Sequence, residues 1–249
     1  MEARIMLITG GSRGIGAATA RLAAAQGYKV CINYQRNQAA ARQLVEDIAG
    51  EGGQAFAVQA DIADETEVLR LFATLDREPG RLAALVNNAG ILERQMRVED
   101  MDAARLSRIL ATNVTGSFLC AREAIRRMST RRGGKGGAIV NVSSIAARLG
   151  APDEYVDYAA SKGAIDSFTL GLAKEVAADG IRVNAVRPGV IRTEIHASGG
   201  EPGRVERVKE GVPMKRGGQA EEVAHAILWL LSDQASYTSG AILDVTGGR

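Results

Sequence analysis

The chain has 249 residues, of which 46% are hydrophobic and 24% charged, and this composition excludes a disordered, fibrous or membrane-spanning protein. Its 31 basic and 29 acidic side chains give a net charge of +2, which is too even to indicate nucleic acid or a membrane surface as a partner. No apolar run reaches 18 residues and the N-terminus resembles no signal peptide, so we expect a cytoplasmic protein with reduced thiols at Cys31 and Cys120.

Short apolar segments alternate with longer segments of helical period along the whole chain. The segments expected to be strands are residues 5–9, 29–33, 55–60, 82–87, 138–142, 181–186 and 241–245. The segments expected to be helices are residues 14–26, 38–49, 65–77, 102–128, 155–178 and 220–231. Strands separated by helices favour a parallel sheet. We therefore predict one α/β domain over residues 1–249, a Rossmann-type doubly wound seven-stranded parallel sheet with helices on both faces.

A glycine-rich turn, TGGSRGIG at residues 9–16, follows the first predicted strand and opens a helix. Glycines permit a tight turn and close backbone approach, and a helix N-terminus offers N–H groups to a phosphate. The spacing departs from the G-x-G-x-x-G dinucleotide motif, so the turn alone is also compatible with a purely structural role. Turn and fold together favour a bound nucleotide. The residues expected to contact it are Gly10, Ser12, Arg13, Gly14, Ile15 and Gly16.

The segment after the second predicted strand favours NADP(H) over NAD(H), which is expected as a weaker cofactor. Dinucleotide sites for NAD carry an acidic residue there that binds the ribose hydroxyls, and residues 17–45 contain none. The segment reads Tyr34-Gln35-Arg36 instead, and all three are expected at the cofactor. Arg36 and Arg13 could clamp a 2′-phosphate, since guanidinium suits phosphate. The alternative is that Arg36 is a solvated residue at a helix start.

Four motifs occur in order along the chain: TGGSRGIG, then NNAG at residues 87–90, then YAASK at 158–162, then Pro188-Gly189. In order and spacing they resemble the short-chain dehydrogenase/reductase family, and the resemblance covers essentially the whole chain. It implies hydride transfer between a nicotinamide cofactor and a carbonyl or alcohol carbon, and a homotetramer. The chain is similar to sugar and alcohol dehydrogenases and to 3-oxoacyl-carrier-protein reductases.

The resemblance also implies four catalytic residues. Tyr158 matches the general acid/base, and Lys162, one helical turn further on, matches the lysine that binds the nicotinamide ribose. An ammonium so close is expected to lower the pKa of the tyrosine. Ser144 matches the serine that bonds the substrate oxygen, with Ser143 as the alternative, and Asn113 matches the asparagine of a proton relay.

Tyr155 is expected to have no part in the chemistry, because the residue four positions on is alanine rather than lysine. Further cofactor contacts follow from the family register alone. The residues matching adenine and adenosine contacts are Asp61, Ile62, Asn88, Ala89 and Gly90. The residues matching nicotinamide contacts are Pro188, Gly189, Val190, Ile191 and Thr193.

No spacing of His, Cys, Asp or Glu indicates a metal site, and His225 is expected at a helix surface. His196 lies at the start of a polar, glycine-containing segment, residues 194–218, that we expect to act as a mobile lid, and a substrate contact of His196 stays open.

A basic run at residues 122–135 is either a solvated helix face or a docking surface for an acidic carrier protein, while nucleic acid is not expected because no aromatic residues interleave with it. The family resemblance implies that the position of Asp179 is often basic in carrier-protein reductases, so Asp179 is expected to repel such a partner. We therefore predict a small ketone, aldehyde or sugar as substrate. The alternatives are a 3-oxoacyl-carrier-protein reductase and an inactive nucleotide-binding or scaffold protein.

Overall fold

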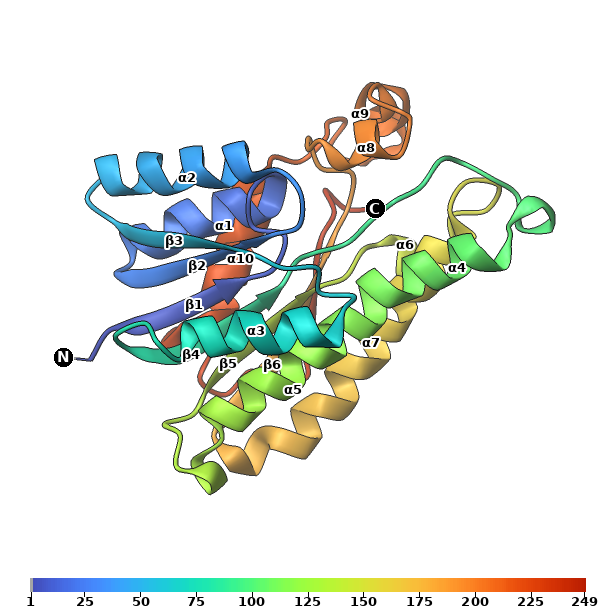
Figure 1. Ribbon diagram of the computed structural model, residues 1–249. Helices are drawn as coiled ribbons and strands as arrows, with labels where there is room; N and C mark the ends of the chain where they lie inside the picture. The colour runs from blue at the N-terminus through green and yellow to red at the C-terminus, as the bar shows by residue number, and fades with distance from the viewer. Residues whose placement is uncertain (1) are drawn as a thin grey trace.

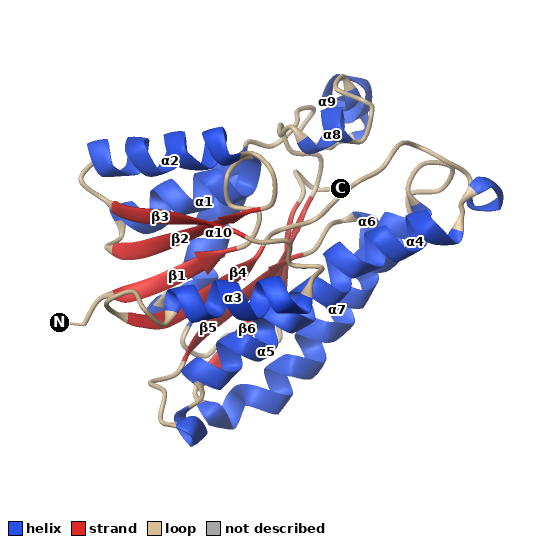
Figure 2. Ribbon diagram, in the orientation of Figure 1, coloured by secondary structure: helices blue, strands red, loops and turns tan. Residues whose placement is uncertain are grey.

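The computed structural model describes residues 2–249, in which one sheet of seven parallel strands lies between two layers of helices (Figures 1 and 2). The strands are β1 (Arg4–Ile8), β2 (Tyr28–Tyr34), β3 (Gln54–Gln59), β4 (Arg81–Asn87), β5 (Gly137–Val142), β6 (Ile181–Pro188) and β7 (Ile242–Val245). Their order across the sheet is β3-β2-β1-β4-β5-β6-β7. The predicted Rossmann-type α/β fold is therefore confirmed.

Helices cover both faces of the sheet, and only the longer ones cross between strands. These are α1 (Gly14–Ala25), α2 (Gln38–Gly50), α3 (Glu65–Leu75), α4 (Ala103–Leu110), α5 (Gly116–Met128), α7 (Val156–Val176) and α10 (Ala220–Leu231). The short helices are α6 (Ala146–Leu149), α8 (Ile195–Ser198) and α9 (Arg204–Val208). Single 3₁₀ turns lie at Val98–Asp100, Thr130–Arg132, Ala177–Asp179, Lys209–Gly211 and Asp233–Ala235.

Strand β1 shows how the sheet is buried on both sides. Successive side chains of a strand point to opposite faces. Met6 and Ile8 pack in one apolar core with α1, α2 and α10, whereas Ile5 and Leu7 pack in a second core with α3, α5 and α7. This double burial accounts for the continuous apolar runs in the sequence.

The strand order reverses between β1 and β4, because the chain runs outward from β1 to β3 and then returns. Open α/β sheets bind ligands at such a switch point, beyond the carboxyl ends of the strands. The ladder pairs Ile8 with Val86, so the glycine turn after β1 lies beside the turn after β4.

The stretch expected as one helix over residues 102–128 is divided. Helix α4 ends at Leu110, a π-helical turn spans Ala111–Thr115, and α5 begins at Gly116. Such wide turns inside helices are rare and frequent at functional sites. None of the helices within residues 2–249 is long and apolar enough to span a bilayer.

Candidate active site

A cleft of about 1250 Å³ opens at the carboxyl ends of the strands and extends from the glycine turn to helices α8 and α9. Nearly all of the residues expected at the site line it. Gly16 and Asn113 are the two that do not, and both lie directly behind its wall. The sheet edge therefore brings together residues that are more than 180 positions apart in the chain.

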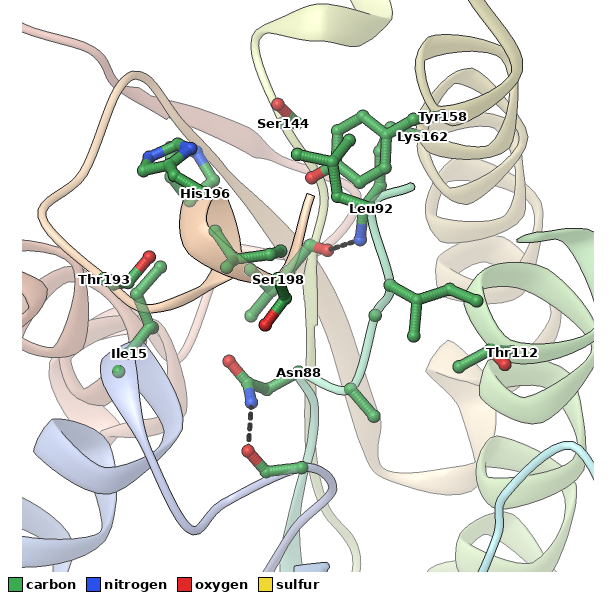
Figure 3. Close-up of a pocket in the computed structure, with 18 of the residues that line it drawn as sticks. Ile15, Asn88, Leu92, Thr112, Ser144, Tyr158, Lys162, Thr193, His196 and Ser198 are labelled. Atoms are coloured by element: carbon green, nitrogen blue, oxygen red, sulfur yellow. Dashed lines mark hydrogen bonds between the residues drawn. The ribbon is translucent and has the colours of Figure 1, made fainter. Parts of the chain in front are cut away.

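The glycine turn fits only glycine at the positions that shape it. Gly10 has φ of +58°, and a Cβ there would lie 2.9 Å from the Cα of Ala89. A Cβ on Gly16 would lie 2.6 Å from Nδ2 of Asn88, which donates a hydrogen bond to the Gly10 carbonyl at 3.0 Å (Figure 3). Arg13 precedes α1 without a side-chain cap, so the first N–H groups of the helix are available to a phosphate. The turn thus fits a dinucleotide.

Two exposed arginines belong to the cofactor region, one in the glycine turn and one after β2. Arg13 and Arg36 line the cleft, and neither forms an ion pair within residues 2–249. Asp61, which also lines the cleft, accepts a hydrogen bond from Gln35 Nε2 at 2.6 Å and another from the Ala63 backbone at 3.0 Å. The cofactor region thus contains two cationic side chains and a carboxylate that is hydrogen-bonded within the protein.

Two serines follow β5 directly, and they make different hydrogen bonds. Ser143 is buried and donates to the Lys162 carbonyl at 3.2 Å. Ser144 lines the cleft, as Tyr158 does, and its Oγ accepts a hydrogen bond from the Ala146 backbone N–H at 3.1 Å. Figure 3 shows Ser144, Tyr158 and Lys162 on one side of the pocket, across from Thr193. Of the two serines left open by the sequence, the geometry places Ser144 at the tyrosine.

Burial sets the pKa values of the tyrosine and the lysine. It raises the pKa of Tyr158, and the Ser144 hydrogen bond and the positive charge of Arg204 offset this only in part. Lys162 Nζ donates to the Val142 carbonyl at 2.7 Å and lies 5.6 Å from the Tyr158 ring centre. The sequence predicted that Lys162 lowers the pKa of Tyr158. This prediction is wrong, because the pKa of Tyr158 is raised and Lys162 is not among the groups that shift it. Burial also lowers the pKa of Lys162 to about 8.

Asn113 lies in the π-helical turn and is fully buried. Its Oδ1 accepts from Ile91 N at 2.8 Å, and its Nδ2 donates to the Ile91 carbonyl and to Ser161 Oγ, both at 3.1 Å. A Cβ on Gly90 would lie 3.5 Å from both Asn113 Oδ1 and Lys162 Nζ. The side chain thus joins the segment after β4 to α7, directly behind Lys162. Its part in a proton relay stays a prediction.

The predicted lid carries two short helices and is tied to the opposite wall of the cleft by four charged residues, which we call the lid ion cluster. Arg204 pairs with Glu154 at 2.5 Å and with Glu201 at 3.0 Å, and Arg207 pairs with Glu154 at 2.7 Å and also with Glu201. Glu154 precedes α7, whereas the other three lie in the lid. Glu154 and Arg204 are 50 residues apart, so no local sequence pattern predicted this contact.

Tyr155 and His196 both lie at the substrate end of the cleft. Tyr155 is 2% exposed and lines the cleft, with the Arg204 guanidinium 4.9 Å from its ring centre. Its hydroxyl has no hydrogen-bond partner among the described residues, although sequence reasoning gave Tyr155 no role. His196 lines the same region and donates from Nε2 to the Ile191 carbonyl at 2.9 Å.

Known proteins resemble the chain over its full length. A family model described as enoyl-(acyl carrier protein) reductase matches residues 10–249. An uncharacterized oxidoreductase of Escherichia coli, YgfF, is 63% identical over 98% of this chain and 99% of its own. A 3-oxoacyl-[acyl-carrier-protein] reductase of Synechocystis is 39% identical over 100% of this chain and 97% of its own.

Among solved structures, a short-chain dehydrogenase/reductase from Serratia marcescens superimposes with a TM-score of 0.91 at 31% identity, covering 99% of this chain and 98% of that one. Sequence, site geometry and fold therefore agree, and the chain belongs to the short-chain dehydrogenase/reductase family of oxidoreductases.

Proposed function

We propose that the protein, acting as one domain over residues 1–249, is an NADP(H)-dependent oxidoreductase that interconverts a carbonyl and an alcohol in a small ketone, aldehyde or sugar. The observation that carries this proposal is that Ser144, Tyr158 and Lys162 lie together on the wall of a cleft that the glycine turn also lines (Figure 3). A nicotinamide cofactor bound there would supply or accept the hydride.

The protein's own groups position the substrate and move the proton. Ser144 and Tyr158 hold the substrate oxygen from one side, and Tyr158 donates a proton to it during reduction and accepts one during oxidation. Because the pKa of Tyr158 is raised, its hydroxyl is protonated at neutral pH and is suited to donate. Lys162 binds the ribose hydroxyls of the cofactor, and Thr193 bonds the nicotinamide carboxamide.

The preference for NADP(H) rests on Arg13 and Arg36. A charge-assisted hydrogen bond contributes about 1.5–3 kcal/mol, so losing two of them lowers affinity by at least roughly 100-fold. We predict that Arg13→Ala with Arg36→Ala lowers kcat/KM for NADPH by about that factor and leaves kcat/KM for NADH within about threefold. Initial rates with each cofactor measure this. Equal use of both cofactors by the unaltered protein would contradict the preference.

A carrier-protein substrate is the main alternative, since several relatives and the matching family model are named as carrier-protein reductases. Most charges of the basic run are paired within the protein, and exposed Arg132 is the one without an ion pair among the described residues. Arg122 pairs with Glu65 at 2.7 Å, and Arg127 pairs with Asp76, the residue that follows the C-terminus of α3. Arg131 pairs with Asp179 at 2.9 Å.

The expectation that Asp179 repels a carrier needs a correction. The side chain is 6% exposed and accepts hydrogen bonds from Ser129 and Arg131, so it neutralises a docking cation rather than presenting an acid to the partner. The outcome for docking is the same, because the free positive charge of this surface is reduced.

The substrate end of the cleft favours a short polar substrate. Glu154, Arg204 and Arg207 line it, and apolar methylenes of a long acyl chain would desolvate these charges. The test compares ethyl acetoacetate and a panel of aldehydes and sugars with a 3-oxoacyl carrier-protein thioester at low salt, where docking is strongest. We expect no advantage for the carrier-bound substrate. A much higher kcat/KM for it, falling steeply with salt, would establish the alternative.

The third hypothesis is that the chain is an inactive nucleotide-binding or scaffold protein. The presence of the complete set Asn113, Ser144, Tyr158 and Lys162 argues against it. Oxidation of NADPH that requires an added carbonyl compound distinguishes an enzyme from a scaffold.

A further inference from the structure

A buried ion pair joins α4 to the first turn of α7, directly beside Tyr158. Arg105 Nε lies 2.7 Å from Asp157 Oδ2, and Arg105 Nη2 lies 3.3 Å from Asp157 Oδ1. The two side chains are 4% and 1% exposed. Removing two charges from water is costly, and apolar replacements of buried pairs are often equally stable. Stability alone is therefore a weak explanation for this pair.

Both members of the pair also hold backbone of the active-site wall. Arg105 Nη1 donates to the Arg94 carbonyl at 2.7 Å, in the segment that follows β4 and the cofactor turn. Asp157 Oδ1 accepts from the Tyr158 backbone N–H at 2.9 Å, one of the N–H groups of α7 that lacks a helical partner. Helix α4 itself continues into the π-helical turn that carries Asn113.

We propose that Arg105 and Asp157 are a positioning pair that fixes Tyr158 relative to the segment after β4. A guanidinium bound to a carboxylate through two hydrogen bonds has a defined geometry, unlike a single point-charge contact. Displacing a reacting group by about 1 Å can lower a rate by roughly 100-fold. The catalytic meaning of the pair rests on the proposed function, but its structural effect does not.

A second ion pair spans nearly the same two segments and provides the matched control. Arg97 Nη1 lies 2.9 Å from Asp153, and these side chains are 63% and 72% exposed. Solvent screens such a pair, and neither residue lines the cleft. The Arg97→Met variant is therefore expected to behave as the unaltered protein does.

The test uses Arg105→Met combined with Asp157→Asn, which removes both charges and leaves no unpaired buried ion. Arg105→Lys, which keeps the charge but loses the two-pronged geometry, is the second variant. Hydrogen exchange followed by mass spectrometry reports on residues 155–162 and 91–97 without any substrate. Steady-state rates with NADPH and ethyl acetoacetate give kcat and KM.

We expect exchange in both segments to be at least about tenfold faster in the double variant, with unchanged exchange in the sheet. In the double variant we expect kcat to fall by roughly 10–100-fold, with KM within about twofold of the unaltered value. The kcat of Arg105→Lys should lie between those of the double variant and the unaltered protein. Exchange and kcat equal to those of Arg97→Met, in either altered protein, would overturn the proposal. If the double variant exchanges faster but the unaltered protein reduces no carbonyl compound, the proposed function is overturned and the positioning pair stands.

Discussion

At the level of single residues, burial governs the ionisation of Tyr158 and Lys162. It favours the neutral phenol and disfavours the ammonium, which places the pKa of Lys162 at about 8. The sequence predicted that these residues share one helix face, because a spacing of four fixes that. The direction of the tyrosine shift could not be predicted, since it depends on apolar groups and on Ser144, which come from distant segments.

Replacement of Tyr158 by phenylalanine removes the proton donor and keeps the ring. We predict that kcat falls at least 100-fold, the scale of general acid catalysis, while the dissociation constant of NADPH stays within about twofold. Fluorescence titration and initial rates measure the two quantities. Tyr155→Phe is the comparison, with any loss confined to KM. An inactive Tyr155→Phe and an active Tyr158→Phe would show that the wrong tyrosine was assigned.

Lys162 is expected to lower the stability of the fold. Its pKa lies near 8 in the folded chain against an ordinary value of 10.5, so the unfolded chain binds more protons between these values and stability rises with pH there. Below pH 8 the penalty is fully present and amounts to about 3 kcal/mol.

We therefore predict that Lys162→Met is inactive but more stable at pH 7, by up to about 3 kcal/mol less the lost bond to Val142. The gain should shrink between pH 8 and 10.5. Urea unfolding at pH 7 and pH 9.5 measures it. A variant that is less stable than the unaltered protein at pH 7 would refute the argument.

At the level of elements, the π-helical turn shows what periodicity misses. Residues 102–128 carry a continuous helical pattern, and the sequence predicted a continuous helix. The turn at residues 111–115 is stabilised by the bonds of Asn113 to Ile91 and Ser161, which are 22 and 48 residues away. Contacts at such separations are outside the reach of a local pattern, although Asn113 itself was found through the family motif.

We predict that Glu154 holds the lid against the opposite wall of the cleft through its ion pairs with Arg204 and Arg207. Burial raises its pKa, but hydrogen bonds from Arg204 and Arg207 outweigh this and keep the pKa below its ordinary value. Glu154→Gln leaves both guanidinium groups without this charged partner. We predict roughly tenfold faster tryptic cleavage within residues 204–216, since an open lid exposes these sites.

Glu206→Gln is the control for the lid experiment. Glu206 lies on α9, as Arg204 and Arg207 do, and pairs with Arg192 at 2.7 Å and with Lys209 at 2.6 Å. The Glu206 and Arg192 side chains are about half exposed and neither lines the cleft. Its cleavage rate should match that of the unaltered protein. Equal cleavage of the two variants would show that Glu154 does not hold the lid.

At the level of the whole molecule, exposed apolar side chains gather on the helices that flank one sheet face. Leu110 on α4, Phe118 on α5 and Leu170 on α7 are each nearly half exposed, and Phe118 stacks on Phe168 with ring centres 3.7 Å apart. We predict a homotetramer that buries these helices, as the family resemblance implies. Phe118→Glu with Leu170→Glu should yield smaller species in sedimentation, because buried charge opposes association. A stable monomer of the unaltered protein at micromolar concentration would contradict this.

The overall architecture could be predicted because each strand and crossover helix carries its own local pattern, and three of the four motifs fall at the carboxyl ends of strands while the fourth lies on α7. The ion pairs that shape the site could not. Arg105 and Asp157 are 52 residues apart, Glu154 and Arg204 are 50 apart, and charged side chains of this kind are more often solvated. Only the folded chain shows which of the 60 charged residues are partners.

The most direct test of the central claim is the rate of NADPH oxidation by the purified protein in the presence of ethyl acetoacetate, aldehydes and sugars, measured beside Tyr158→Phe. We predict oxidation that depends on one or more of these carbonyl compounds, yields the corresponding alcohol and falls at least 100-fold in the variant. Tight binding of NADPH with no carbonyl reduction above the level of Tyr158→Phe would contradict the account.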